Sequence, residues 1–170
     1  MIKELEEIEF KILNPCDLKI SAIQQDQENT DYSGVSIHFK DFKMKFRNAK
    51  ITPKKIGQFV TFWKKNGDHK NEPYHLNDGF DYYIVATKQE ERFGFFFFPK
   101  QVLAEKNILS HDKKLGKMGF RIYPVWDFPT SKQAAKTKQW QSDYFVELDS
   151  SEQKYMEKFK SILKVSYFRV

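Results

Sequence analysis

The sequence lacks the residues and patterns that mark several common classes of protein. Its 170 residues include one cysteine, Cys16, so no disulfide can form within the chain. Seven glycines and six prolines are too few for a collagen-like or low-complexity protein. The longest apolar runs, Tyr82–Ala86 and Phe95–Phe98, fall far short of the ~20 residues that span a bilayer. Because the first ten residues are acidic rather than basic, we expect no signal peptide, no membrane partner and a cytoplasmic location.

Motifs that mark common enzyme and metal sites are also missing. The chain has no Walker loop, no G-x-G-x-x-G, no G-x-S-x-G and no paired cysteines at zinc spacing. Its histidines, His38, His69, His75 and His111, do not have the spacing of metal ligands. We therefore predict no cofactor and no metal, assign no catalytic residue, and leave open whether the protein is an enzyme.

Positive charge is plentiful and is concentrated in two segments. The net charge is +6, and lysines supply 25 of the 29 basic residues, a ratio that AT-rich codon usage alone would produce. The distribution is more informative, because residues 40–70 hold ten basic and two acidic residues, and residues 100–140 hold nine and three. Two such basic blocks indicate an anionic partner, and a polyanion fits them better than one phosphate does.

Hydrophobic periodicity predicts one α+β domain over residues 1–170, with a single mostly antiparallel or mixed sheet packed by several helices. We expect helices over residues 2–13, 53–66, 99–109, 131–148 and 151–164. We expect strands over residues 35–40, 42–47, 80–87, 92–98 and 119–124. The first two strands are predicted to form a hairpin, and the outward face of the second, with Lys43, Lys45 and Arg47, is expected to be wholly basic.

Lysine occupies the first turn of three predicted helices, where acidic residues are usual. These positions are held by Lys54 and Lys55, by Lys100, and by Lys132. Each arrangement costs ~0.3–1 kcal/mol unless an anion compensates, and the free N–H groups of a helix start can bind phosphate. Lys136 lies on the same side of its helix as Lys132, opposite the expected core side.

The leading hypothesis is a nucleic-acid-binding protein, for DNA or RNA, that contacts the phosphate backbone with little base specificity. Phosphate contacts are predicted for Lys50, Lys54, Lys55, Lys100, Arg121, Lys132 and Lys136, with Arg47 and Trp126 as secondary candidates. Trp126 and Phe128 lie in a predicted loop, where their rings are free to stack on unpaired bases. The oligomeric state stays open.

Two other functions remain possible from the sequence. A divalent-metal nuclease would use clustered carboxylates, and the candidates are Asp78, Asp81, Glu90 and Glu91. If the strands over 80–87 and 92–98 form a hairpin, however, these two pairs fall at opposite ends of it. The third possibility is a module that binds a protein or a small ligand, which an exposed apolar patch would favour.

Several segments closely resemble the MepB-like family of small bacterial proteins. They are KITPKKIGQFVTFWKK (50–65), FDYYIVAT (80–87), GFFFFPKQVLAEKNIL (94–109), GFRIYPVWD (119–127) and TSKQAAKTKQWQSDYF (130–145). The resemblance extends from about Asp31 to Phe145. It implies an α+β fold of the kind compared with nucleic-acid-binding and nuclease domains, and it supplies no catalytic residue.

Overall fold

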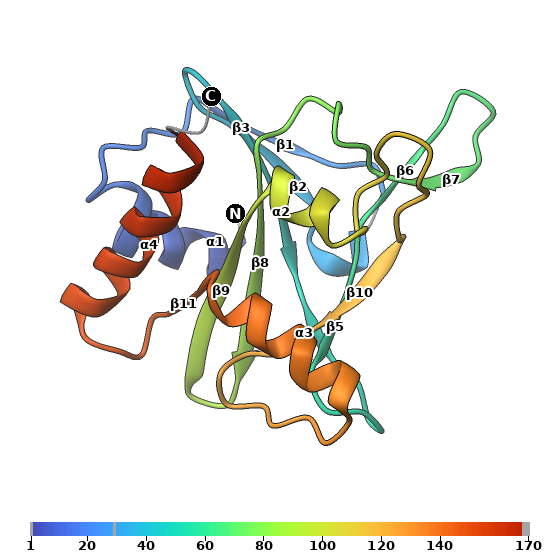
Figure 1. The fold of residues 1–170 in the computed structure, drawn as a ribbon. Coiled ribbons are helices and arrows are strands. Elements are labelled where there is room, and N and C mark those ends of the chain that lie inside the picture. Colours follow the sequence, from blue (N-terminus) through green and yellow to red (C-terminus); the bar gives the residue numbers. More distant parts are fainter. Residues whose placement is uncertain (1, 29, 168–170) are drawn as a thin grey trace.

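A six-stranded mixed sheet runs through the middle of the molecule. The computed structural model describes residues 2–28 and 30–167 (Figure 1). In spatial order the sheet contains β1 (Ala22–Gln25), β2 (Val35–His38), β3 (Lys43–Asn48), β8 (Tyr82–Gln89), β9 (Arg92–Pro99) and β11 (Phe145–Glu147). The β3–β8 pair is parallel and the other pairs are antiparallel. The α+β class and the β2–β3 hairpin are thus as predicted, and the strands predicted over 80–87 and 92–98 pair as the hairpin β8–β9.

At its central strands β8 and β9 this sheet is buried on both faces, which explains why β9 carries four phenylalanines in a row. Successive residues of a strand point to opposite faces, so Phe95 and Phe97 join one hydrophobic cluster and Phe96 and Phe98 join the other. All four side chains are fully buried. A run without polar residues is typical of a strand that is covered on both sides.

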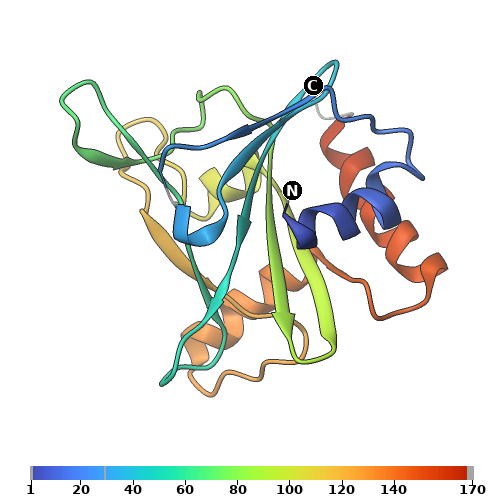
Figure 2. The same ribbon diagram turned by 180° about the vertical axis from the view of Figure 1, so that it is seen from behind.

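Helices cover both faces (Figures 1 and 2). They are α1 (Lys3–Ile8) with the π-helical segment η1 (Glu9–Leu13), the 3-10 turn η2 (Thr30–Tyr32), α2 (Lys100–Glu105), α3 (Lys132–Ser142) and α4 (Glu152–Tyr167). Leu5 of α1 and Phe159 of α4 pack on the face of Phe95 and Phe97. On the other face, Leu103 of α2 packs with Phe96 and Phe98. Among the described helices, none is both long and apolar enough to cross a bilayer.

The predicted helix over residues 53–66 is wrong, and with it the expectation of a single sheet. A second sheet contains β10 (Gly119–Ile122), β5 (Gln58–Thr61) and β4 (Lys50–Ile51), and a third contains β6 (Trp63–Lys65) and β7 (Asn71–Pro73). Val60 and Phe62 are buried while their neighbours are half-buried, which is the alternation of strands. Gly57, at φ 89°, takes the left-handed conformation at the end of the β4–β5 turn.

The helix predicted over residues 131–148 is shorter in the structure. It ends at Ser142, and the chain then forms β11, which pairs Phe145 with Phe96 and Val146 with Phe95. The edge of β9 needs a hydrogen-bonding partner, and pairing there buries Phe145 and Val146. The predicted start of the helix is confirmed, because Ser131 caps the N-terminus by accepting a hydrogen bond from the N–H of Ala134 (3.1 Å).

Candidate functional site

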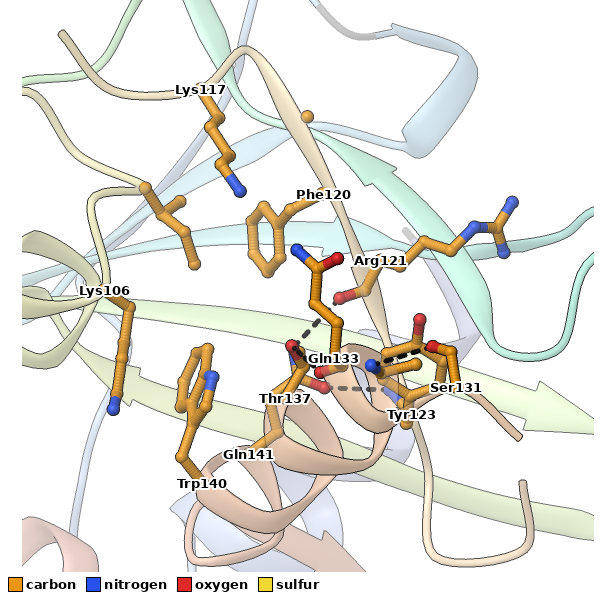
Figure 3. A pocket seen from close by; sticks show the side chains of 13 residues that line it. Lys106, Lys117, Phe120, Arg121, Tyr123, Ser131, Gln133, Thr137, Trp140 and Gln141 are labelled. Carbon is orange, nitrogen blue, oxygen red and sulfur yellow. Dashed lines mark hydrogen bonds between the residues drawn. The ribbon is translucent and has the colours of Figure 1, made fainter. Parts of the chain in front are cut away.

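A pocket of about 330 Å3 lies between β10, α3 and the segment that joins α2 to β10. We call it the basic pocket. Figure 3 shows its walls, which include Lys106, Lys117, Phe120, Arg121, Gln133 and Trp140. Lys106 and Lys117 are cationic, the guanidinium of Arg121 points away from the pocket, and no acidic residue is among the described residues that line it. A pocket walled by cations, amides and aromatic rings is suited to an anionic ligand that also has a flat apolar part.

Gln141 holds α3 against the free edge of β10. Its Nε2 donates to the carbonyl oxygen of Arg121, and its Oε1 accepts from the N–H of Tyr123, both at 2.9 Å. The side chain is fully buried. The amide thus satisfies two backbone groups that a further strand would otherwise bind. This interaction fixes the two elements that form opposite walls of the basic pocket.

Trp140 and Gln133 supply the aromatic and amide surfaces of the pocket. The Nζ of Lys106 lies 5.4 Å from the centre of the Trp140 ring, a cation–π contact, and the same ring packs against Phe98. Gln133 is exposed, and its carboxamide points toward Phe120 and the middle of the pocket (Figure 3). The pocket therefore presents an aromatic face, a cation and a neutral donor–acceptor group side by side.

The outer face of the three-stranded sheet continues the basic surface. Lys50 is opposite Phe59 on β5, and Phe59 is opposite Arg121 on β10. Residues directly opposite each other in antiparallel strands project from the same face. Lys50, Phe59 and Arg121 therefore form a cation–aromatic–cation row. The exposed Lys50 places its Nζ 4.8 Å from the centre of the Tyr32 ring.

Lys54 and Lys55 lie in the exposed turn between β4 and β5, not at a helix start. Arg121 braces this turn. Its Nη2 donates to Oγ1 of Thr52 (2.6 Å), and its Nη1 donates to the carbonyl oxygens of Ile56 and Gly57 (3.3 and 3.4 Å). The guanidinium thus has hydrogen bonds within the protein, and its role is to position the turn as well as to add charge. Because no helix begins here, Lys54 and Lys55 cannot bind phosphate through a helix N-terminus.

The remaining lysine candidates separate into two places. Lys132 and Lys136 are exposed on α3, whose residues Gln133 and Thr137 line the basic pocket. Lys100 begins α2 and is half-buried, and its N–H donates to the carbonyl oxygen of Asp81. It does not line the basic pocket. The structure therefore brings Lys132 and Lys136 beside the pocket and leaves Lys100 apart from it.

Arg47 does not lie on an outward basic face, so that prediction is wrong. It is fully buried, and its Nη1 lies 2.7 Å from Oδ2 of Asp26. The face that carries Lys45 and Arg47 is covered by a second layer, which includes Phe62, 5.7 Å from the guanidinium. Burial alone would raise the pKa of Asp26, but Arg47, the Ser36 hydroxyl and Lys45 together lower it. Arg47 therefore cannot contact phosphate.

Trp126 is half-buried, so its ring is not a free stacking surface. It packs edge-on against Phe145 with ring centres 5.6 Å apart, and its Nε1 is buried without an acceptor among the described residues. Phe128 is different, with 72% of its surface exposed and the Nζ of Lys138 4.0 Å from its ring centre. Of the two predicted stacking residues, Phe128 alone is accessible.

The four carboxylates considered for a nuclease do not come together. Asp78 binds Nζ of Lys64 (2.7 Å), and Asp81 precedes β8. Glu90 and Glu91 form the turn at the far end of the same eight-residue strand, roughly 25 Å away at ~3.3 Å per residue. Within residues 2–28 and 30–167, no group of three His, Cys, Asp or Glu side chains is placed to hold a metal ion.

Three residues of the basic pocket could not be located from the sequence: Lys106, Lys117 and Gln133. The two lysines lie in the second basic block, so their charge is evident from the sequence but their position is not. Their convergence depends on the loop between α2 and β10, which no periodicity describes. Gln133 gives no signal, because a glutamine on an exposed helix turn has no distinctive pattern.

The fold and pocket define an α+β protein with mixed sheets, and comparison with known proteins identifies its family. The MepB-like family profile matches residues 26–147, so the chain belongs to the MepB-like family. The crystal structure of MepB is similar over 89% of this chain and 100% of that one, with 33% identity and a TM-score of 0.77. A bacterial homing endonuclease is 12% identical, with a TM-score of 0.42 over 81% of this chain and 84% of that one, too low to support inference. No curated protein matches.

Proposed function

We propose that this protein binds nucleic acid through its phosphate backbone, with little sequence specificity. The observation that carries the proposal is the basic pocket, which Lys106 and Lys117 line without an acidic residue in the described lining, while the guanidinium of Arg121 lies outside it against the β4–β5 turn. In a chain with 23 acidic residues, such a region attracts anions. The proposal includes a cytoplasmic location, where the single cysteine, Cys16, stays reduced.

Lysines on both sides of the pocket extend its basic surface, so that several phosphates of one polyanion can bind at once. Lys54 and Lys55 project from the β4–β5 turn, which both ribbon views place beside the start of α3 (Figures 1 and 2). Lys132 and Lys136 are exposed on α3 itself. Binding of phosphate by lysine orients a strand but does not read its sequence. Binding of this kind is therefore general rather than specific.

The test is a fluorescence-anisotropy titration with DNA and RNA, single- and double-stranded, at several salt concentrations. We expect log affinity to fall linearly with log salt concentration, because binding releases the counterions of the phosphates. Replacing Lys54 and Lys55 together by alanine removes up to two lysine–phosphate pairs. The slope should then decrease by about 0.7–0.9 for each pair removed, alike for all sequences.

The matched control replaces Lys154 and Lys160 by alanine. Both are exposed on α4, on the opposite face of the large sheet, and the net charge changes equally. This control should bind as the wild-type protein does. Equal weakening in both double variants would show that only net charge matters, and the assignment of binding to the basic pocket would be wrong.

The same titration repeated with magnesium tests whether the protein cleaves the strand. A cleavage product would indicate a nuclease.

A further inference from the structure

The basic pocket is larger than a phosphate group requires. Its volume of about 330 Å3 is at the lower end of pockets that enclose small organic ligands, roughly 300–1,000 Å3. Phe120 and Trp140 form apolar walls, and each has a lysine beside it, Lys117 next to Phe120 and Lys106 next to Trp140 (Figure 3). We propose that the pocket takes one unpaired base of a bound strand, so that the protein prefers single-stranded nucleic acid. This inference rests on the proposed function.

The Trp140 ring is the surface on which the base stacks. Phe98 packs at 5.7 Å between ring centres, and Lys106 lies over the ring at 5.4 Å. Lys106 is exposed, so its ammonium can leave the ring. An exposed cation–π contact is weaker than the stacking of a base on an aromatic ring. A base can therefore replace Lys106, which then lies close to the phosphate of the same nucleotide.

Gln133 supplies hydrogen bonds to the edge of the base. Its exposed carboxamide has both a donor and an acceptor, and it points into the pocket (Figure 3), whereas the amide of Gln141 is bound to β10. The hydroxyl of Thr137 donates to the main-chain carbonyl oxygen of Gln133 and leaves the carboxamide free to turn. A neutral amide can pair with any base by rotating about its last bond, so Gln133 favours a base without selecting one.

Only an unpaired base can enter the pocket. In a duplex the base edges are paired and the faces are stacked, so a base must first leave the stack, at a cost. Single strands already expose bases for stacking on protein rings. The pocket therefore predicts a preference for single strands that binding to the phosphate backbone alone would not produce.

The experiment compares single strands and duplexes of equal length by anisotropy at low salt, using the wild-type protein and three variants. Trp140→Leu removes the stacking surface, and Gln133→Leu removes the amide without touching the core. Gln139→Leu is the control, an equal change at an exposed position of α3 that does not line the pocket. We expect Trp140→Leu to weaken single-strand binding about tenfold, Gln133→Leu to weaken it less, and Gln139→Leu to leave it unchanged.

A strand carrying one 2-aminopurine reports the stacking directly. Its fluorescence should be quenched by the wild-type protein and by Gln139→Leu, and not by Trp140→Leu. Equal affinity for single strands and duplexes, with no effect of the pocket variants, would overturn this inference and leave the proposed function intact. Absence of salt-sensitive binding to any nucleic acid would overturn both. A free nucleoside monophosphate that binds as tightly as the strand would assign the pocket to a small molecule, and so contradict the inference.

Discussion

Asp26 and Arg47 form an ion pair inside the protein, with Oδ2 and Nη1 2.7 Å apart. Asp26 also accepts a hydrogen bond from the Ser36 hydroxyl (2.7 Å) and one from Nζ of Lys45 (3.2 Å). The pair joins the segment before β2 to β3 and lies beneath the layer that contains Phe62. Removing one partner of such a pair leaves a buried charge without compensation, which is far more costly than removing an exposed salt bridge.

Replacing Asp26 by asparagine should lower the free energy of unfolding by about 3–5 kcal/mol, because Arg47 then remains charged and buried. Urea denaturation followed by circular dichroism measures this change. The control is Asp68→Asn, in an exposed turn, which should alter stability by no more than about 0.5 kcal/mol. Similar stability of the two variants would mean that the pair does not stabilise the fold.

The same pair predicts how stability depends on pH. The pKa of Asp26 in the folded protein is below its ordinary value of 3.8, so the ionised carboxylate stabilises the folded state. That contribution is complete above the unfolded pKa and is lost as the pH falls from about 4 through the folded pKa. We expect the wild-type protein to lose more stability than Asp26→Asn over this acid range. Parallel pH profiles of the two proteins would contradict the assignment.

Gly34 is required by the buried guanidinium. A Cβ atom at this position would lie 2.9 Å from both Cζ and Nη1 of Arg47. Gly34→Ala should therefore cost about 1–3 kcal/mol, the usual penalty for overpacking a buried site. Gly67→Ala is the matched control, since nothing lies within 4 Å of a Cβ atom there. Thermal unfolding of the two variants makes the comparison, and an equal change in Tm would disprove the steric role.

Gln141 should be as sensitive as the ion pair. Gln141→Leu keeps the size of the side chain but leaves the Arg121 carbonyl and the Tyr123 N–H without partners. Each buried unpaired group costs about 1–3 kcal/mol, so we expect stability to fall by at least about 2 kcal/mol, as measured by urea denaturation. Gln139→Leu, exposed on the same helix, should unfold like the wild-type protein. A stable Gln141→Leu variant would show that α3 docks without this amide.

Elements with an unambiguous sequence signal, such as an apolar run or a helix cap, could be predicted from the sequence. The phenylalanine run of β9 fits only a strand that is covered on both faces, and the cap at Ser131 marks the start of α3. The segment over residues 53–66 could not be assigned in this way. Its apolar residues fit a helical period, but Val60 and Phe62 also alternate, and pairing with β10 favours the strand. Contacts distant in sequence therefore decide between two acceptable local patterns.

The candidate site could be predicted only in part, for a related reason. Charge blocks locate Lys54, Lys55, Lys132 and Lys136, which are exposed near the pocket. The alternation of β3 places Arg47 on the same face as Lys45, as the structure does. No local pattern shows that this face is covered, because the covering residue comes from outside the large sheet. Whether a charge is buried depends on tertiary contacts, and so does the position of Lys106 and Lys117 at the pocket.

Hydrogen–deuterium exchange with and without a short single-stranded DNA tests the central claim most directly. If a strand binds across the basic pocket, exchange should slow in residues 106–123 and 131–141, which form its walls. Exchange in α1 and α4, on the opposite face, should stay unchanged. Protection confined to α1 and α4, or no protection in either pocket segment at low salt, would contradict nucleic-acid binding at this site.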